Sequence, residues 1–249
     1  MADYIERTYR GITNAGAYAS FELAVFETDL KIYVDKRLEK DLDRIKPLTQ
    51  AYAEALRGEL EAYIVRNPEF ATTFEPWYDE QAKSPVVRAM IEAGAETGVG
   101  PMAAVAGALA EFGARYLHNF SRSVIVENGG DLFVSVVEET VVGVFAGESP
   151  LSMRLGLVVP PGMAMGICTS SGTVGPSISM GRADAVCVAA ESAAFADALA
   201  TALGNMVKDE RDFEAVMAKA RSYDEVLSVL LILGDKSAIW GGLEIRPLQ

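Results

Sequence analysis

Residues 183–207 read ADAVCVAAESAAFADALATALGNMV and combine the signals of a buried strand with those of the helix that follows it. The short apolar run Val186-Cys187-Val188 is typical of a buried strand. Ser192 stands where a helix N-cap is expected, directly before a segment rich in alanine and leucine. The predicted packing face of that helix repeats at helical spacing and consists of Phe195, Leu199, Ala202, Leu203 and Met206.

A second face of the same predicted helix is polar. Asp197, Thr201 and Asn205 are spaced four residues apart, which places them on one stripe. Aspartate and threonine are weak helix formers, so helix propensity does not explain their presence. The stripe has two interpretations. It is either the solvated face of an amphipathic helix, or a carboxylate and a hydroxyl directed together at a hard cation, which prefers oxygen ligands.

The composition excludes several classes of partner. The chain of 249 residues carries 22 Lys and Arg against 35 Asp and Glu, a net charge of −13, which argues against a nucleic-acid surface and against anionic membranes. Its apolar runs are too short to span a bilayer, and its first residues lack the apolar core of a signal peptide. Cys168 and Cys187 form no CxxC pattern and are expected as reduced thiols of a cytoplasmic protein, although two cysteines alone leave a disulfide open.

The flanking segments alternate between strand and helix patterns. Residues 8–35 predict antiparallel strands, because apolar residues partly alternate with polar ones between turn signals. Residues 38–66 change to a helical period, with Pro47 as a break or as a first helical position. Residues 209–222 predict a further helix. Because no linker or low-complexity segment divides the chain, we expect one compact α+β domain.

Three segments could hold an anionic ligand without a strong positive charge. Gly98-Val99-Gly100-Pro101-Met102 precedes a predicted helix, whose N-terminus would offer free amides and a positive dipole. Asn128-Gly129-Gly130-Asp131 has the chemistry of a hairpin turn, and its glycines would let a ligand lie against the backbone. Residues 169–175, TSSGTVG, read as a loop that could cradle phosphate, although they are not a Walker A loop. Each segment also has a structural explanation: close packing, a tight turn and an ordinary loop.

Other features give no catalytic assignment. The loop 70–83 holds four aromatic residues (Phe70, Phe74, Trp77 and Tyr78) that either stack on a planar ligand or anchor the loop to the core. The only histidine, His118, lies near an expected helix end, where capping or exposure is commoner than catalysis. One histidine and two scattered cysteines cannot build a usual zinc site, and no Ser-His-Asp motif or GxGxxG fingerprint is present.

Three of these blocks follow the order seen in the ApbE-like family, which comprises the FAD:protein FMN transferases and their relatives. Residues 98–119 resemble the family's glycine-started helix, and Val126-Glu127-Asn128-Gly129-Gly130-Asp131 resembles its strand ending in a GGD-type turn. Residues 196–203, ADALATAL, are similar to its metal-binding helix. The resemblance is closer still to the UPF0280 branch, through VGPMAAVAGA, ENGGD, and GICTSSGTVG followed by GRADAV.

This resemblance implies an architecture and a ligand. We expect residues 1–249 to form a single ApbE-like (UPF0280) α+β domain with antiparallel or mixed sheets and packed helices. The family pattern implies a Mg²⁺ site at Asp197 and Thr201 and a bound FAD or other nucleotide. The expected partner is this small-molecule nucleotide, with no nucleic acid and no membrane, and the formation of a homo-oligomer stays open. The residues implied to bind the nucleotide are Gly98, Gly100, Asn128, Gly129, Gly130, Asp131, Thr169, Ser170, Ser171, Gly172 and Thr173.

One departure from the family pattern bears on activity. True flavin transferases carry a His-x-x-Asp-Pro-x-Thr-Gly block between the GGD turn and the metal-binding helix, whereas residues 175–182 here read GPSISMGR. Pro176 stands where the histidine is expected, and a proline ring neither donates a proton nor hydrogen-bonds a ligand. We therefore expect nucleotide binding with inefficient FMN transfer. The alternatives are an active Mg-dependent FAD:protein FMN transferase and, through family association alone, an accessory factor in anaerobic sulfur assimilation.

Overall fold

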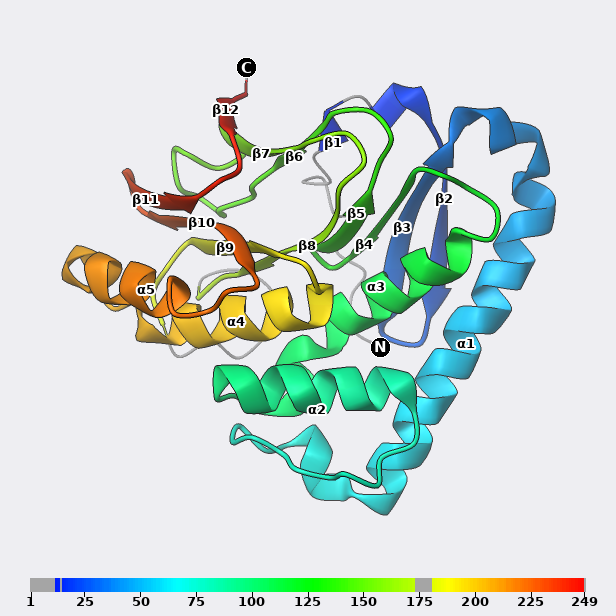
Figure 1. The fold of residues 1–249 in the computed structure, drawn as a ribbon, viewed down its shortest axis with the longest axis horizontal. Helices are drawn as coiled ribbons and strands as arrows, with labels where there is room; N and C mark the ends of the chain where they lie inside the picture. Colours follow the sequence, from blue (N-terminus) through cyan, green and yellow to red (C-terminus); the bar gives the residue numbers. More distant parts are fainter. Residues whose placement is uncertain (1–11, 14, 173–180, 249) are drawn as a thin grey trace.

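The structure, a computed structural model, describes residues 12–13, 15–172 and 181–248 (Figure 1). Among these residues, eight antiparallel strands form the larger sheet and four form a smaller antiparallel sheet. The larger sheet has the order β11 (Lys236–Gly241), β10 (Val226–Leu233), β9 (Ala185–Ala190), β8 (Ala164–Ser170), β5 (Asp131–Ser135), β4 (Val124–Asn128), β3 (Thr28–Asp35), β2 (Tyr18–Val25). The smaller sheet has the order β1 (Ile12–Thr13), β6 (Thr140–Gly143), β7 (Leu155–Val159), β12 (Ile245–Pro247).

Helices cover the face of the larger sheet that is turned away from the smaller sheet (Figure 1). In the described part of the chain, no helix combines the length and the apolar character needed to cross a membrane. The α-helices are α1 (Leu42–Arg66), α2 (Pro85–Thr97), α3 (Val105–Leu117), α4 (Ala193–Met206) and α5 (Phe213–Ala220). Short 3-10 helices are η1 (Ala15–Ala17), η2 (Lys36–Asp41), η3 (Pro68–Ala71), η4 (Pro101–Ala104) and η5 (Glu210–Asp212).

The larger sheet is buried on both faces, which produces two hydrophobic clusters. Along β9, Val186 and Val188 pack in the cluster on the helix side, and Cys187 packs in the cluster between the two sheets. Because successive side chains of a strand alternate between faces, a strand buried on both faces reads as an unbroken apolar run. This confirms the predicted buried strand and the expected α+β fold.

The two cysteines lie on opposite faces of the larger sheet. Cys168 in β8 points to the helix side, whereas Cys187 in the neighbouring β9 points to the smaller sheet. A disulfide requires Cβ vectors that point toward each other, so these two residues are free thiols in this fold. Burial raises the pKa of Cys187 to about 12 and raises that of Cys168 well above its ordinary value. Both thiols therefore stay protonated at neutral pH, which argues against a nucleophilic role.

The predicted start of the α4 helix is confirmed. Ser192 is the N-cap, and its hydroxyl oxygen accepts a hydrogen bond from the Phe195 amide at 3.4 Å. Phe195, Leu199 and Leu203 are buried on the predicted packing face, whereas Met206 at the end of the helix is more than one-third exposed. The helix positions the polar stripe that includes Asp197 and Thr201.

The prediction of a break or a helix start at Pro47 is wrong, because α1 runs through it. A proline inside a helix removes the hydrogen bond to the carbonyl four residues earlier, here that of Asp43. Both residues are exposed, so water can satisfy that carbonyl. Ile45 and Thr49 are buried on the other side, and the Thr49 hydroxyl donates to the Ile45 carbonyl at 2.9 Å. Burial of that face keeps the helix continuous.

Candidate functional site

The N-terminal turn of α3 holds the carboxylate of Asp197. The Gly107 amide donates to Asp197 Oδ2 at 2.9 Å. The first amides of a helix have no partner within the helix, and the helix dipole favours a negative charge there. The glycines and Pro101 ahead of this helix predict an anion site at its N-terminus. The anion that lies there is a side chain of the protein itself.

The hairpin turn between β4 and β5 lies next to the same helix end. Asn128 Nδ2 donates to the Ala106 carbonyl at 3.2 Å, one residue before the amide that Asp197 binds. Asp131 Oδ1 accepts from the Thr169 amide at 3.1 Å, which ties the turn to the end of β8. The GGD-type turn and Asp197 therefore both contact the N-terminal turn of α3.

The turn itself has the predicted tight form. Asn128 pairs with Asp131, and Gly129 and Gly130 between them adopt φ angles of 70° and 105°. Such angles favour glycine in a two-residue hairpin turn. Apart from its own chain neighbours, no described residue lies within 4 Å of the position that a Cβ on Gly130 would take. Among the described residues, the space beside Gly130 is thus open.

The carboxylates of Asp131 and Asp197 repel each other. Removal from water raises the pKa of Asp197 well above its ordinary value, and the negative charge of Asp131 raises it further. The amides of Gly107 and Ala106 act in the opposite direction, because they stabilise the ionised form. A divalent cation would supply the opposite charge. It would therefore offset the cost of ionising the buried Asp197 carboxyl and the repulsion from Asp131.

Thr201 follows Asp197 by one turn of α4, and both residues are half-buried. Within the described residues, no three side chains of the His, Cys, Asp or Glu type gather as a metal centre. A cation at Asp197 would therefore complete its shell with oxygen from the Thr201 hydroxyl, backbone carbonyls, water or a ligand phosphate. This donor set fits Mg²⁺, which is commonly held by one or two carboxylates together with substrate phosphates.

The prediction of a loop over residues 169–175 is wrong for the first two residues. Thr169 and Ser170 are the last residues of β8, where they pair with β9. Ser171 and Gly172 follow the strand, and the Gly172 amide already donates to a backbone carbonyl at 2.9 Å. Thr173 and the rest of the segment lie outside the described residues. The amides of Thr169 and Gly172 are thus engaged within the protein.

Gly98 and Gly100 have structural explanations of their own. Gly98 ends α2 with a φ of 80°, a left-handed conformation that favours glycine. A Cβ on Gly100 would overlap the backbone carbonyl of Thr73. The predicted helix start at Pro101 is a 3-10 helix, so α3 begins only at Val105. A ligand contact by either glycine stays a prediction.

The aromatic loop divides into anchors and exposed rings. Phe70 is fully buried and meets the half-buried Trp77 edge to face, with 6.0 Å between the ring centroids. Trp77 Nε1 donates to the Tyr63 hydroxyl at 3.0 Å. Phe74 and Tyr78, in contrast, are 62% and 77% exposed. The anchoring interpretation therefore holds for two of the four rings.

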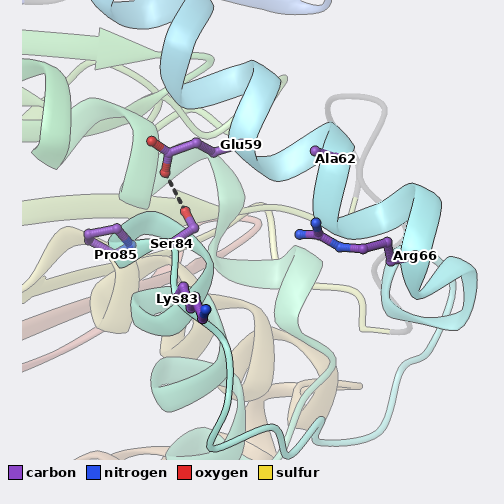
Figure 2. A pocket seen from close by; sticks show the side chains of 6 residues that line it. All are labelled: Glu59, Ala62, Arg66, Lys83, Ser84 and Pro85. Atoms are coloured by element: carbon purple, nitrogen blue, oxygen red, sulfur yellow. Dashed lines mark hydrogen bonds between the residues drawn. The ribbon is translucent and has the colours of Figure 1, made fainter.

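A surface hollow of about 320 Å³ lies apart from these residues, between α1 and the residues that lead into α2 (Figure 2). Figure 2 shows Arg66 and Lys83 at this hollow, and Ser84 Oγ donates to Glu59 Oε2 at 2.6 Å. None of the site residues predicted from the sequence lines it.

Glu111 is a buried charged residue outside the predicted site. Its Oε2 accepts from the Ala193 amide at 2.7 Å and from Ser192 Oγ at 2.9 Å. The sequence contains a signal for this buried position. Glu111 follows Gly107 by four residues, so the two residues share a face of α3. An acidic residue on the small-residue face of a helix predicts a buried partner.

Comparison with known proteins identifies the family. A family model described as AbpE bacteria matches residues 10–232. The UPF0280 protein of Methanocella arvoryzae is 46% identical over 198 residues, which cover 76% of this chain and 77% of the relative. The chain belongs to the UPF0280 family. The UPF0280 protein of Methanococcus aeolicus is 34% identical over 220 residues, which cover 86% of both chains.

Solved structures relate this UPF0280 fold to ApbE. The apo flavinyl transferase ApbE of Pseudomonas stutzeri superposes with a TM-score of 0.56 at 13% identity, covering 90% of this chain and 94% of that one. The ApbE protein of Thermotoga maritima superposes with a TM-score of 0.55 at 14% identity, covering 89% and 96%. At these identities the likeness establishes the ApbE fold.

Proposed function

We propose that this UPF0280 protein binds FAD or another nucleotide through its pyrophosphate together with Mg²⁺, and that it transfers FMN inefficiently. The observation that supports the proposal most is the Asp197 carboxylate, which is held at the N-terminus of α3 close to a second acid, Asp131. A protein with a net charge of −13 needs a cation or backbone amides to hold a pyrophosphate.

Different residues of the proposed site would bind the metal and the nucleotide. Asp197 and Thr201 would hold Mg²⁺, and the bound ion would neutralise charge on the pyrophosphate oxygens. The backbone at Gly130, which borders open space among the described residues, would lie against the nucleotide. Asn128 fixes the turn to α3 through the Ala106 carbonyl, so the two parts of the site keep their relative position.

Inefficient transfer follows from the sequence at residues 175–182. Pro176 replaces the expected histidine, and residues 173–180 lie outside the described part of the chain. We expect FAD and Mg²⁺ to bind without FMN transfer at ordinary enzymatic rates to an ApbE-type acceptor peptide. Mass measurement of that peptide after incubation tests this. A mass gain of one FMN at ordinary rates would favour the alternative, an active Mg-dependent transferase. If the protein bound neither FAD nor any adenine nucleotide, the proposed nucleotide site itself would be contradicted.

Thr201 should contribute to Mg²⁺ binding through its hydroxyl. We expect Thr201→Val to weaken Mg²⁺ binding in the presence of FAD by about tenfold, and Thr201→Ser to retain it, because serine keeps the oxygen ligand. Calorimetric titration of both variants measures the difference. Equal affinity in Thr201→Val and wild type would contradict the ligand assignment and favour the solvated-face interpretation.

A further inference from the structure

Helices α3 and α4 each place a carboxylate at the N-terminal turn of the other helix. Asp197 of α4 accepts from the Gly107 amide in the first turn of α3 at 2.9 Å. In return, Glu111 of α3 accepts from the Ala193 amide, the first residue of α4, at 2.7 Å. A carboxylate at a helix N-terminus satisfies free amides and complements the dipole. The two contacts therefore join the helices reciprocally.

Glu111 is almost fully buried, at 4% exposure, and both of its oxygens are engaged. Oε1 accepts from Arg115 Nε and Nη2 at 3.1 and 2.6 Å, and Oε2 accepts from Ser192 Oγ at 2.9 Å in addition to the Ala193 amide. Because the Ser192 hydroxyl donates its proton to Glu111, its oxygen is available to cap the Phe195 amide. Glu111 thus orients the N-cap of α4 as well as binding its first amide.

The first residue of α4 is enclosed on several sides. A Cβ on Gly107 would overlap the Ala193 carbonyl, and a Cβ on Gly166 of β8 would overlap the Ala193 Cα. The Cys168 thiol donates to the same carbonyl at 3.4 Å. These contacts place α4 in direct backbone contact with both α3 and the sheet. Asp197 follows Ala193 by one turn of the same helix.

We infer that Glu111 is a positioning residue for the proposed Mg²⁺ site. It holds the first turn of α4 against α3 and so keeps Asp197 at the α3 N-terminus, beside the turn that carries Asp131. This inference rests on the proposed function, because the affinity it predicts is that of the Asp197 site. Glu111 would act indirectly, because both of its oxygens already accept from Arg115, Ser192 and Ala193.

The test compares Glu111→Ala with Glu111→Gln. The alanine variant removes the acceptor for Ala193 and Ser192, and Mg²⁺ affinity in the presence of FAD should fall by about 10- to 100-fold in the folded protein. The glutamine variant should recover most of that affinity, because its amide oxygen can still accept from the Ala193 amide. Glu111→Asp, whose shorter side chain withdraws the carboxylate from Ala193, replaces the alanine variant if that variant does not fold.

A matched control is available on α2. Arg88 and Glu92 form an i, i+4 ion pair like that of Glu111 and Arg115, but both side chains are exposed, at 60% and 67%. Glu92→Ala should leave Mg²⁺ affinity unchanged. Calorimetry is performed well below the melting temperature of each variant, so that loss of folded protein does not enter the affinity.

Amide hydrogen exchange of the metal-free protein gives a second readout. We expect Glu111→Ala to lose protection in the first turn of α4, around Ala193–Asp197, while the remainder of that helix keeps it. A folded Glu111→Ala with wild-type Mg²⁺ affinity and wild-type protection would overturn the inference. Failure of the wild-type protein to bind Mg²⁺ with FAD would instead defeat the proposed function, and the exchange pattern would still decide whether Glu111 positions α4.

Discussion

Asp197→Asn should abolish Mg²⁺-dependent binding of FAD and, at the same time, raise the melting temperature of the metal-free protein at neutral pH. Asparagine keeps the oxygen that accepts from the Gly107 amide at 2.9 Å but carries no charge. Loss of the carboxylate removes a metal ligand. We expect Mg²⁺ affinity to fall by at least about 100-fold, because the loss of a ligand should cost more than the loss of a residue that only supports one. It also removes the repulsion from Asp131 and the cost of a charge withdrawn from water.

The pH dependence of this gain has a defined sign. The pKa of Asp197 lies well above its ordinary value of 3.8, so the folded protein holds this proton more tightly than the unfolded chain does. The contribution of Asp197 to the free energy of unfolding therefore falls as pH rises from about 3.8 to the raised pKa, and the loss is complete above it. The melting temperature of Asp197→Asn should match that of wild type at low pH and exceed it increasingly as pH rises.

Thermal unfolding at several pH values, with and without Mg²⁺ and FAD, measures both effects. Saturating ligand should stabilise wild type and leave Asp197→Asn unchanged, because only a protein that binds the ligand gains from it. Asp79 is a control of opposite sign, since hydrogen bonds from the Tyr63 hydroxyl and the Gln81 amide lower the pKa of its carboxyl. Asp79→Asn should lose stability at neutral pH and keep its response to Mg²⁺. Wild-type FAD and Mg²⁺ affinity in Asp197→Asn would refute the assignment.

Local signals account for what could be predicted from the sequence. The N-cap at Ser192 and the hairpin turn Asn128–Asp131 depend on residues within a few positions of one another, so the chain reveals them without knowledge of the fold. Strand alternation could not show that β8 extends through Ser170, because the pairing with β9 decides where β8 ends. Thr169 and Ser170, two hydroxyl residues of the predicted phosphate loop, therefore belong to the strand.

Long-range contacts explain what could not be predicted. The contact between Asp197 and the Gly107 amide spans 90 positions, and that between Glu111 and the Ala193 amide spans 82. In the sequence, Gly107 and Ala193 are simply small residues in two alanine-rich helices, a composition that helix propensity alone explains. Only the packing shows that the two helices meet there at backbone distance. The family pattern pointed to Asp197 but not to the residues that position it.

Gly107→Ala should be among the most destabilising single-methyl substitutions in this protein. The added Cβ would overlap the Ala193 carbonyl and would lie 2.9 Å from Asp197 Cβ, and neither α3 nor α4 can move without disturbing the contacts between Glu111 and Ala193. Overpacking against backbone costs about 3 kcal/mol. For a chain of this size, that corresponds to a melting temperature lower by roughly 6–12 °C.

Gly113→Ala is the matched control for this substitution, because it lies in the same helix and is also buried. A Cβ there would lie 3.8 Å from Val126 Cγ1, an ordinary van der Waals contact. Alanine favours a helix over glycine by about 1 kcal/mol, so this variant should match or exceed wild-type stability. Gly107→Ala should also lose Mg²⁺ affinity, since separation of the helices withdraws Asp197 from the α3 amides. A melting temperature of Gly107→Ala equal to that of Gly113→Ala would show that α3 and α4 do not cross at this distance.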